Sequence, residues 1–135
     1  MDSADTADAR PSFSVPMYPV VTMGAGAHQG SRDRLLGFDA LPDLIDAYSC
    51  EKHVPADAPP TFLVLAADDT TVPPMPNAGA YFAALQAAKI PSEMHMFEAG
   101  GHGFGIARTV GKPTAVWPDL LLHWGSSRGI FKAAG

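Results

Sequence analysis

The segment that most constrains the fold is residues 61–66 (Thr-Phe-Leu-Val-Leu-Ala), a continuous apolar run. An unbroken run of this length is typical of a parallel strand that is covered on both faces. Two further candidate strands are residues 13–18 and residues 92–97. Because Pro16 has no N–H for a strand ladder, we expect residues 13–18 to form an edge or bulged strand.

Helical patterns follow each candidate strand. Residues 77–89 are rich in alanine, carry large apolar side chains at helical spacing, and offer Asn77 as an N-cap. The other predicted helical segments are residues 31–37, 42–48 and 114–127. Strands that alternate with helices predict right-handed crossovers, so we expect an α/β fold with three parallel strands and covering helices in the order β-α-β-α-β-α.

Two aspartates and one histidine follow the ends of neighbouring predicted strands. Asp68 and Asp69 come directly after residues 61–66, and His102 follows residues 92–97 within a glycine-rich run (residues 100–105, Gly-Gly-His-Gly-Phe-Gly). Ligands of parallel sheets sit at the carboxyl ends of the strands, so these side chains are expected at one edge of the sheet. Glycines on both sides of the histidine allow the close approach of backbone or ligand.

A carboxylate beside a histidine is the orienting half of a nucleophilic triad. The carboxylate holds the imidazole tautomer, and the imidazole takes a proton from a hydroxyl group. Histidine suits this task because its charge changes near neutral pH. We therefore interpret His102 as a general base; the two aspartates cannot point the same way, and the spacing alone does not choose between them.

Composition excludes several other classes of protein. The 135 residues suffice for one domain at most, and 47% apolar content is ordinary for a globular chain. A net charge of −5 with scattered basic residues indicates no nucleic-acid surface, and no apolar run approaches a membrane span. Cys50 is the single cysteine, so an internal disulfide and CxxC metal pairs are excluded.

No motif for a cofactor is present. His95, Glu98 and His102 are candidate metal ligands by residue type, but they lack the helical HExxH spacing. Residues 101–105 are not a dinucleotide fingerprint, because the third glycine is misplaced and no helix is expected to start there. We expect neither a metal nor another cofactor.

The run Asp69-Thr70-Thr71-Val72-Pro73, with Gly-Gly-His-Gly-Phe at residues 100–104, resembles the C-terminal half of α/β-hydrolases. The likeness is greatest to the acetyl-xylan-esterase or endoxylanase-B-like esterases, which are akin to dienelactone hydrolases and to the prolyl oligopeptidase catalytic domain. Further matching stretches are residues 10–13, 18–20, 30–32, 35–37, 48–49, 59–63 and 117–118. The resemblance implies that Asp69 is the triad acid and His102 the base, and that Asp68 is a turn or supporting residue.

The nucleophile of that family has no counterpart at the expected place. The superfamily order is Ser, then Asp or Glu, then His, so a Gly-x-Ser-x-Gly elbow should precede Asp69. The one formal match, residues 125–129 around Ser127, follows both Asp69 and His102 and comes after a predicted helix rather than a strand. We interpret it as a chance match at a helix C-terminus, where glycine is common.

The predicted organisation is an acidic lead-in (residues 1–10) followed by the C-terminal part of one α/β-hydrolase domain (residues 11–135). The resemblance implies part of a serine ester hydrolase, inactive alone, that acts on small-molecule or carbohydrate esters such as acetylated polysaccharide. The alternatives are a non-catalytic remnant or binding module, and a truncated gene product. The first strand would expose an edge that self-associates or requires the missing N-terminal half; the sequence assigns no localisation.

Overall fold

Two parallel strands, β1 (Thr61–Ala66) and β2 (Ser92–Phe97), form the centre of the computed structural model, which describes residues 9–131. Their register pairs Thr61 with Ser92 and Ala66 with Phe97. Both strands have the predicted boundaries. All six residues of β1 are buried, as expected for an apolar run with both faces covered.

The segment 13–18 differs from the prediction, because it is not a strand. It runs parallel to β1 but makes only two isolated bridges, Ser14 with Thr61 and Met17 with Val64. Between these two bridges, the residue at position 16 faces β1 and would normally donate its N–H to that strand. Pro16 has no N–H, so this hydrogen bond is missing. Tyr18 then turns the chain with a φ of 39°. The predicted three-stranded sheet is therefore two strands plus one bridged segment.

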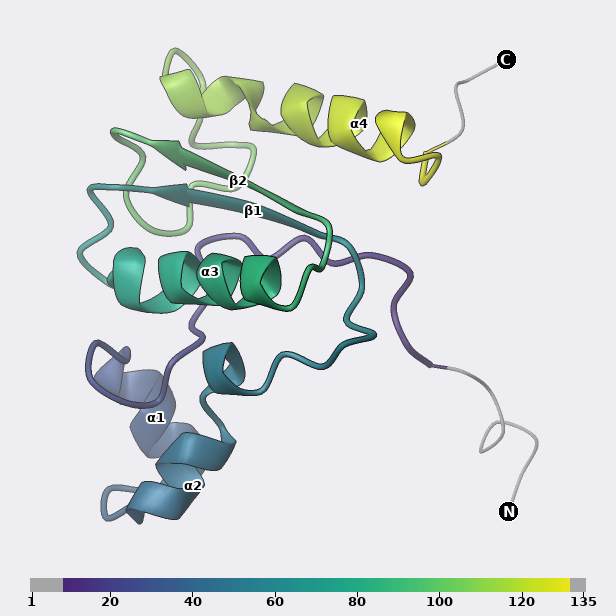
Figure 1. Cartoon of the computed structure of the whole chain (residues 1–135). Coiled ribbons are helices and arrows are strands. Elements are labelled where there is room, and N and C mark those ends of the chain that lie inside the picture. The colour runs from purple at the N-terminus through teal and green to yellow at the C-terminus, as the bar shows by residue number, and fades with distance from the viewer. Residues whose placement is uncertain (1–8, 132–135) are drawn as a thin grey trace, which may run out of the picture.

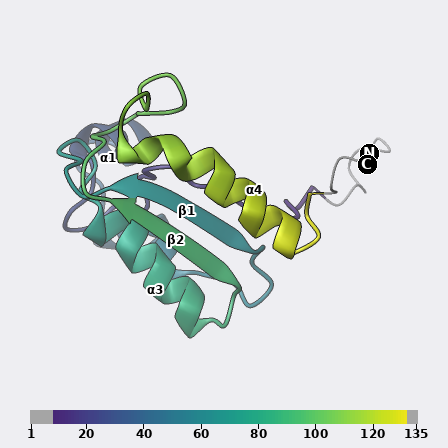
Figure 2. The same ribbon diagram turned by 90° about the horizontal axis from the view of Figure 1, so that it is seen from above.

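Two helices cover opposite faces of the sheet, α3 (Ala80–Ala87) on one side and α4 (Trp117–Ser127) on the other (Figures 1 and 2). Successive side chains of β1 point to opposite faces, so each face has its own core cluster. On the α4 side the cluster contains Phe62, Val64, Ala66, Phe104, Trp117 and Trp124. On the α3 side it contains Leu63, Leu65, Ala78, Leu85 and Ile90.

The predicted helix over residues 77–89 begins earlier and ends sooner than expected. A π-helical turn over Met75–Gly79 leads directly into α3, so Asn77 is inside helical structure and the prediction that it caps the helix is wrong. Its side chain is fully buried and bonds backbone groups instead, three of them more than 50 residues away. The four contacts are Val21 N–H and Thr22 N–H to its Oδ1, and its Nδ2 to the carbonyl oxygens of Gly26 and Pro73.

The remaining elements lie close to their predicted positions. They are α1 (Gln29–Leu36), α2 (Pro42–Ala47) and a 3-10 turn over Pro113–Val116 that leads into α4; a further 3-10 turn over Cys50–Lys52 was not predicted. Residues 1–8 of the predicted lead-in fall outside the described residues, so the domain division stays a prediction. Within residues 9–131, no helix combines the length and apolar character that crossing a bilayer requires.

Candidate active site

Asp69 and His102 meet at the carboxyl end of the sheet. The loop after β1 carries Asp69, and the loop after β2 carries His102; both loops lie at the same end of the strands (Figure 1). His102 Nδ1 lies 2.8 Å from Asp69 Oδ2. The structure therefore brings together the two side chains that the sequence placed on neighbouring strand ends.

The other oxygen of the Asp69 carboxylate is held by its own turn. Oδ1 accepts hydrogen bonds from the N–H groups of Thr71 and Val72, each at 2.9 Å. The side chain is 2% exposed, and Val72 is buried beside it. These bonds fix the carboxylate in one orientation, with Oδ2 directed at the imidazole.

The contact selects the tautomer of the neutral His102 ring. An ionised carboxylate only accepts hydrogen bonds, so in the neutral ring Nδ1 carries the proton and Nε2 keeps an open lone pair. The His102 side chain is 32% exposed. Within residues 9–131, Nε2 has no hydrogen-bond partner, so it is available to accept a proton from an incoming hydroxyl group.

Tyr18 is a member of the site that sequence reasoning missed. Its ring packs edge-on against His102, with centroids 4.9 Å apart, and against Phe104 at 5.1 Å. Phe104 is buried, so the stack ties the histidine loop to the core. An aromatic residue directly before Pro19 at the end of a predicted strand was the available signal, but it gave no indication of the partner.

Asp68, predicted to be a turn or supporting residue, bonds the histidine loop. Its Oδ1 accepts the N–H groups of Gly100 at 2.9 Å and Gly101 at 2.8 Å. The bond from Gly101, with that from Gly100, lowers the pKa of Asp68 below its usual value, although partial desolvation acts in the opposite direction. The two successive aspartates thus point to different partners in the same loop.

The glycines around His102 have distinct roles. Gly101 and Gly103 have φ values of +65° and +70°, a conformation that costs glycine little and other residues more. Gly100 is needed for space instead, because a Cβ there would lie 2.8 Å from Thr114 Cγ2 and 3.1 Å from Ala66 Cβ. Both glycines that flank His102 thus adopt a backbone conformation that favours glycine.

The candidate metal ligands do not gather. His95 Nε2 contacts Glu93 Oε1 at 2.6 Å on β2, while His102 is bound to Asp69. Among the residues that the structure describes, no group of three or more His, Cys, Asp or Glu side chains could hold a metal ion. That the protein needs no cofactor stays a prediction.

Ser127 lies far from the imidazole. It is the last residue of α4, whose C-terminal end is at the opposite end of the sheet from the His102 loop (Figure 1). Its hydroxyl donates to the Trp124 carbonyl at 2.9 Å. The Gly-x-Ser-x-Gly match is thus a helix terminus, and no serine hydroxyl in residues 9–131 is bonded to His102.

The other histidines have local partners. His28 Nδ1 lies 3.3 Å from Ser31 N and 2.9 Å from Ser31 Oγ, which makes His28 the N-cap of α1 rather than a free loop residue. His53 and His123 contact the backbone carbonyls of Asp46 and Asp119. None of the three contacts Asp69 or His102.

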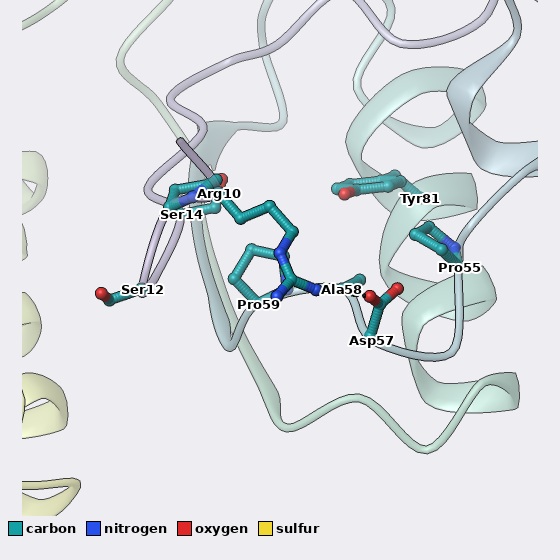
Figure 3. A pocket seen from close by; sticks show the side chains of 9 residues that line it. Arg10, Ser12, Ser14, Pro55, Asp57, Ala58, Pro59 and Tyr81 are labelled. Carbon is teal, nitrogen blue, oxygen red and sulfur yellow. Dashed lines mark hydrogen bonds and ion pairs between the residues drawn. The ribbon is translucent and has the colours of Figure 1, made fainter. Parts of the chain in front are cut away.

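A hollow of about 640 Å³ lies at the other end of β1 (Figure 3). Arg10 and Asp57 form an ion pair of 2.8 Å on its wall, and the Tyr81 ring forms another part of the wall. Ser14, also in the wall, is bridged to the first residue of β1, whereas Asp69 follows the last. The hollow is therefore separate from the Asp69–His102 pair.

Comparison with known proteins confirms the resemblance. Residues 28–124 match the model of the prolyl oligopeptidase family. Endo-1,4-beta-xylanase B of Butyrivibrio fibrisolvens is 34% identical, over 73% of this chain and 15% of its own length. Acetylxylan esterase of Xylanibacter ruminicola is 33% identical, over 73% of this chain and 22% of its own length.

Solved structures agree. The acetyl ester-xyloside bifunctional hydrolase from Caldicellulosiruptor lactoaceticus has a TM-score of 0.86 and 34% identity, covering 91% of this chain and 44% of its own. The carboxylesterase Cest-2923 from Lactobacillus plantarum has a TM-score of 0.77 and 26% identity, covering 96% and 49%. The chain thus spans less than half of each of these relatives and has a partial α/β-hydrolase fold. The chain belongs to the prolyl oligopeptidase family.

Proposed function

We propose that this chain carries the acid and base of a serine ester hydrolase, with Asp69 as the acid and His102 as the base. The observation that supports this most is the 2.8 Å contact between a buried carboxylate and Nδ1 of an imidazole whose Nε2 is open. We further propose that the nucleophilic serine and the oxyanion donors come from residues outside this chain. The isolated chain is then inactive.

In the proposed reaction, Nε2 of His102 takes the proton of the serine hydroxyl as its oxygen bonds to the ester carbonyl carbon. Asp69 stabilises the imidazolium that forms. The imidazolium then gives its proton to the departing alcohol oxygen as the carbon–oxygen bond of the ester breaks. Water then gives a proton to the same imidazole as its oxygen bonds to the acyl carbon. The bond between that carbon and the serine oxygen breaks, the imidazolium returns the proton to the serine, and the acid leaves.

The proposed substrates are acyl esters, in particular acetyl esters on a polysaccharide. Support comes from the names of two relatives, an acetylxylan esterase and an acetyl ester-xyloside hydrolase. The acyl and alcohol pockets of such an enzyme would depend partly on the serine-bearing half. The carbohydrate assignment is therefore tested separately from the chemistry.

The test joins this chain to the part of the Caldicellulosiruptor hydrolase that it does not cover, and measures turnover of p-nitrophenyl acetate and acetylated xylan. We expect turnover that falls by about 10³–10⁴ in His102→Ala and in Asp69→Asn. Ser127→Ala is the matched control and should keep full activity. Ester turnover by the isolated chain that disappears in Ser127→Ala would contradict the proposal.

A second candidate is a non-catalytic role in which the chain associates through its sheet edge. Because Ser14 and Tyr18 direct their backbone groups at β1, those of Phe13, Val15 and Met17 point away from it. Within residues 9–131 these three backbones have no hydrogen-bond partner. An unpaired edge favours the addition of another strand.

Sedimentation of the isolated chain distinguishes the second candidate. A dimer that dissociates in Val15→Pro, which removes one outward N–H, supports association through this edge. A monomer at all concentrations would contradict the second candidate. The edge would then be expected to pair with the N-terminal half that the hydrolase proposal requires.

A further inference from the structure

We infer that Asp68 is a positioning residue for His102: its carboxylate anchors the backbone just before the imidazole and so holds the ring against Asp69. The inference rests on the proposed function only for its consequence in catalysis. Asp68 does not contact the imidazole, so any effect on His102 passes through the loop.

The first support is the order of contacts between the two loops. Three consecutive residues after β1 bond the last residue of β2 and then the loop after it, and the contacts advance in step along both chains. They are Ala67 N–H to Phe97 O at 2.7 Å, Gly100 and Gly101 N–H to Asp68 Oδ1 at 2.9 and 2.8 Å, and Asp69 Oδ2 to His102 Nδ1 at 2.8 Å. The Asp68 contact is therefore the link between the end of the sheet and the imidazole.

The second support is the open space where a side chain of Gly101 would lie. A Cβ built on Gly101 would meet no atom within 4 Å, whereas one on Gly100 would collide with Thr114. Glycine has the most conformational freedom to lose, and Gly101 has no side-chain packing to restrict it. The hydrogen bond to Asp68 provides a constraint one residue before His102.

The third support is chemical. A carboxylate accepts hydrogen bonds more strongly than a neutral oxygen. The N–H groups of Gly100 and Gly101 hold the pKa of Asp68 low, so the group is charged at neutral pH. The Asp69 carboxylate cannot replace it, because its oxygens are engaged by Thr71, Val72 and His102.

The experiment measures the isolated, ¹⁵N-labelled chain by NMR in wild type, Asp68→Ala and Asp68→Asn. The readouts are amide exchange at Gly100 and Gly101, and the exchange rate of the His102 Nδ1 proton. We expect Asp68→Ala to accelerate all three by about tenfold, because the acceptor is lost. Asp68→Asn keeps a weaker acceptor oxygen, and about a threefold change is expected.

Glu98→Ala is the matched control, because it removes one negative charge from the same loop without removing a described hydrogen bond; it should leave all three rates unchanged. If Asp68→Ala accelerates the glycine amides but leaves the Nδ1 proton as protected as in wild type, Asp68 is only a loop brace and the inference is overturned. If Asp68→Ala does not fold, the same rates in Asp68→Asn decide, and wild-type values there overturn the inference.

These rates do not depend on ester turnover, so failure of the hydrolase proposal leaves them unchanged. In the joined enzyme, the inference predicts that Asp68→Ala lowers kcat about tenfold with little change in KM, and that Asp68→Asn restores most of it.

Discussion

β1 and the segment 13–18 lie side by side in the same sheet, yet only one of them is a regular strand. β1 is bonded on both edges, by β2 and by the segment, and each of its faces meets a helix. The segment is bonded on one edge only, interrupted by Pro16 and ended by the turn at Tyr18. β2 is also bonded on one edge only and is still regular, so the segment owes its irregularity to the missing N–H of Pro16 and to the turn at Tyr18.

The two sides of the candidate active site also differ in their hydrogen bonding. On the β1–β2 side, Asp69 and His102 are held by several hydrogen bonds. On the side of segment 13–18, the described residues provide Tyr18 against the imidazole but no hydroxyl group bonded to it. The proposed serine would supply that hydroxyl group.

The largest effect should come from the core that β1 supports. Phe62 is fully buried against Trp124, whereas Phe13 on the neighbouring segment is only half-buried. We expect Phe62→Ala to lower the free energy of unfolding by about 3–5 kcal/mol and Phe13→Ala by less than half of that. Urea denaturation monitored by tryptophan fluorescence measures both, and equal losses would contradict the comparison.

Asn77 ties the first part of the chain to the helix that follows β1. Replacement by alanine leaves the N–H groups of Val21 and Thr22 and two carbonyl groups without their partner. We expect Asn77→Ala to cost about 3 kcal/mol of unfolding free energy, measured in the same way. Gln86→Ala, which removes an exposed bond to Ser92, is the control and should cost about 0.5 kcal/mol or less.

Proline substitution separates the inner and outer edges of the segment. Ser14 donates its N–H to the Pro60 carbonyl at 2.9 Å, while Val15 donates to no described group. We expect Ser14→Pro to cost about 1–3 kcal/mol, because the acceptor loses its partner, and Val15→Pro to cost less. Thermal unfolding of the two variants checks the difference; a greater loss in Val15→Pro would show that the outer edge is already paired.

The smallest effect concerns the pH dependence of the loop contact at Asp68. Its pKa in the folded chain is below the ordinary value of 3.8, so the stabilising contribution is complete above pH 3.8 and is lost as the pH falls through the lower folded pKa. The charge of Lys112 also lowers the pKa of Asp68. The amide shifts of Gly100 and Gly101 should titrate with a midpoint below 3.8 by NMR, and Asp68→Asn should abolish that titration.

The sequence by itself determined the boundaries of β1 and β2, the alternation of strands and helices, and the placement of Asp69 and His102 at one end of the sheet. These features depend on local apolar patterns and on the direction of parallel strands, both of which are visible in a single chain. Only the tertiary structure decided the roles of Asn77, Tyr18 and Asp68. Each acts through partners more than 30 residues away, and no local pattern specifies which of many polar or aromatic groups will meet across that distance.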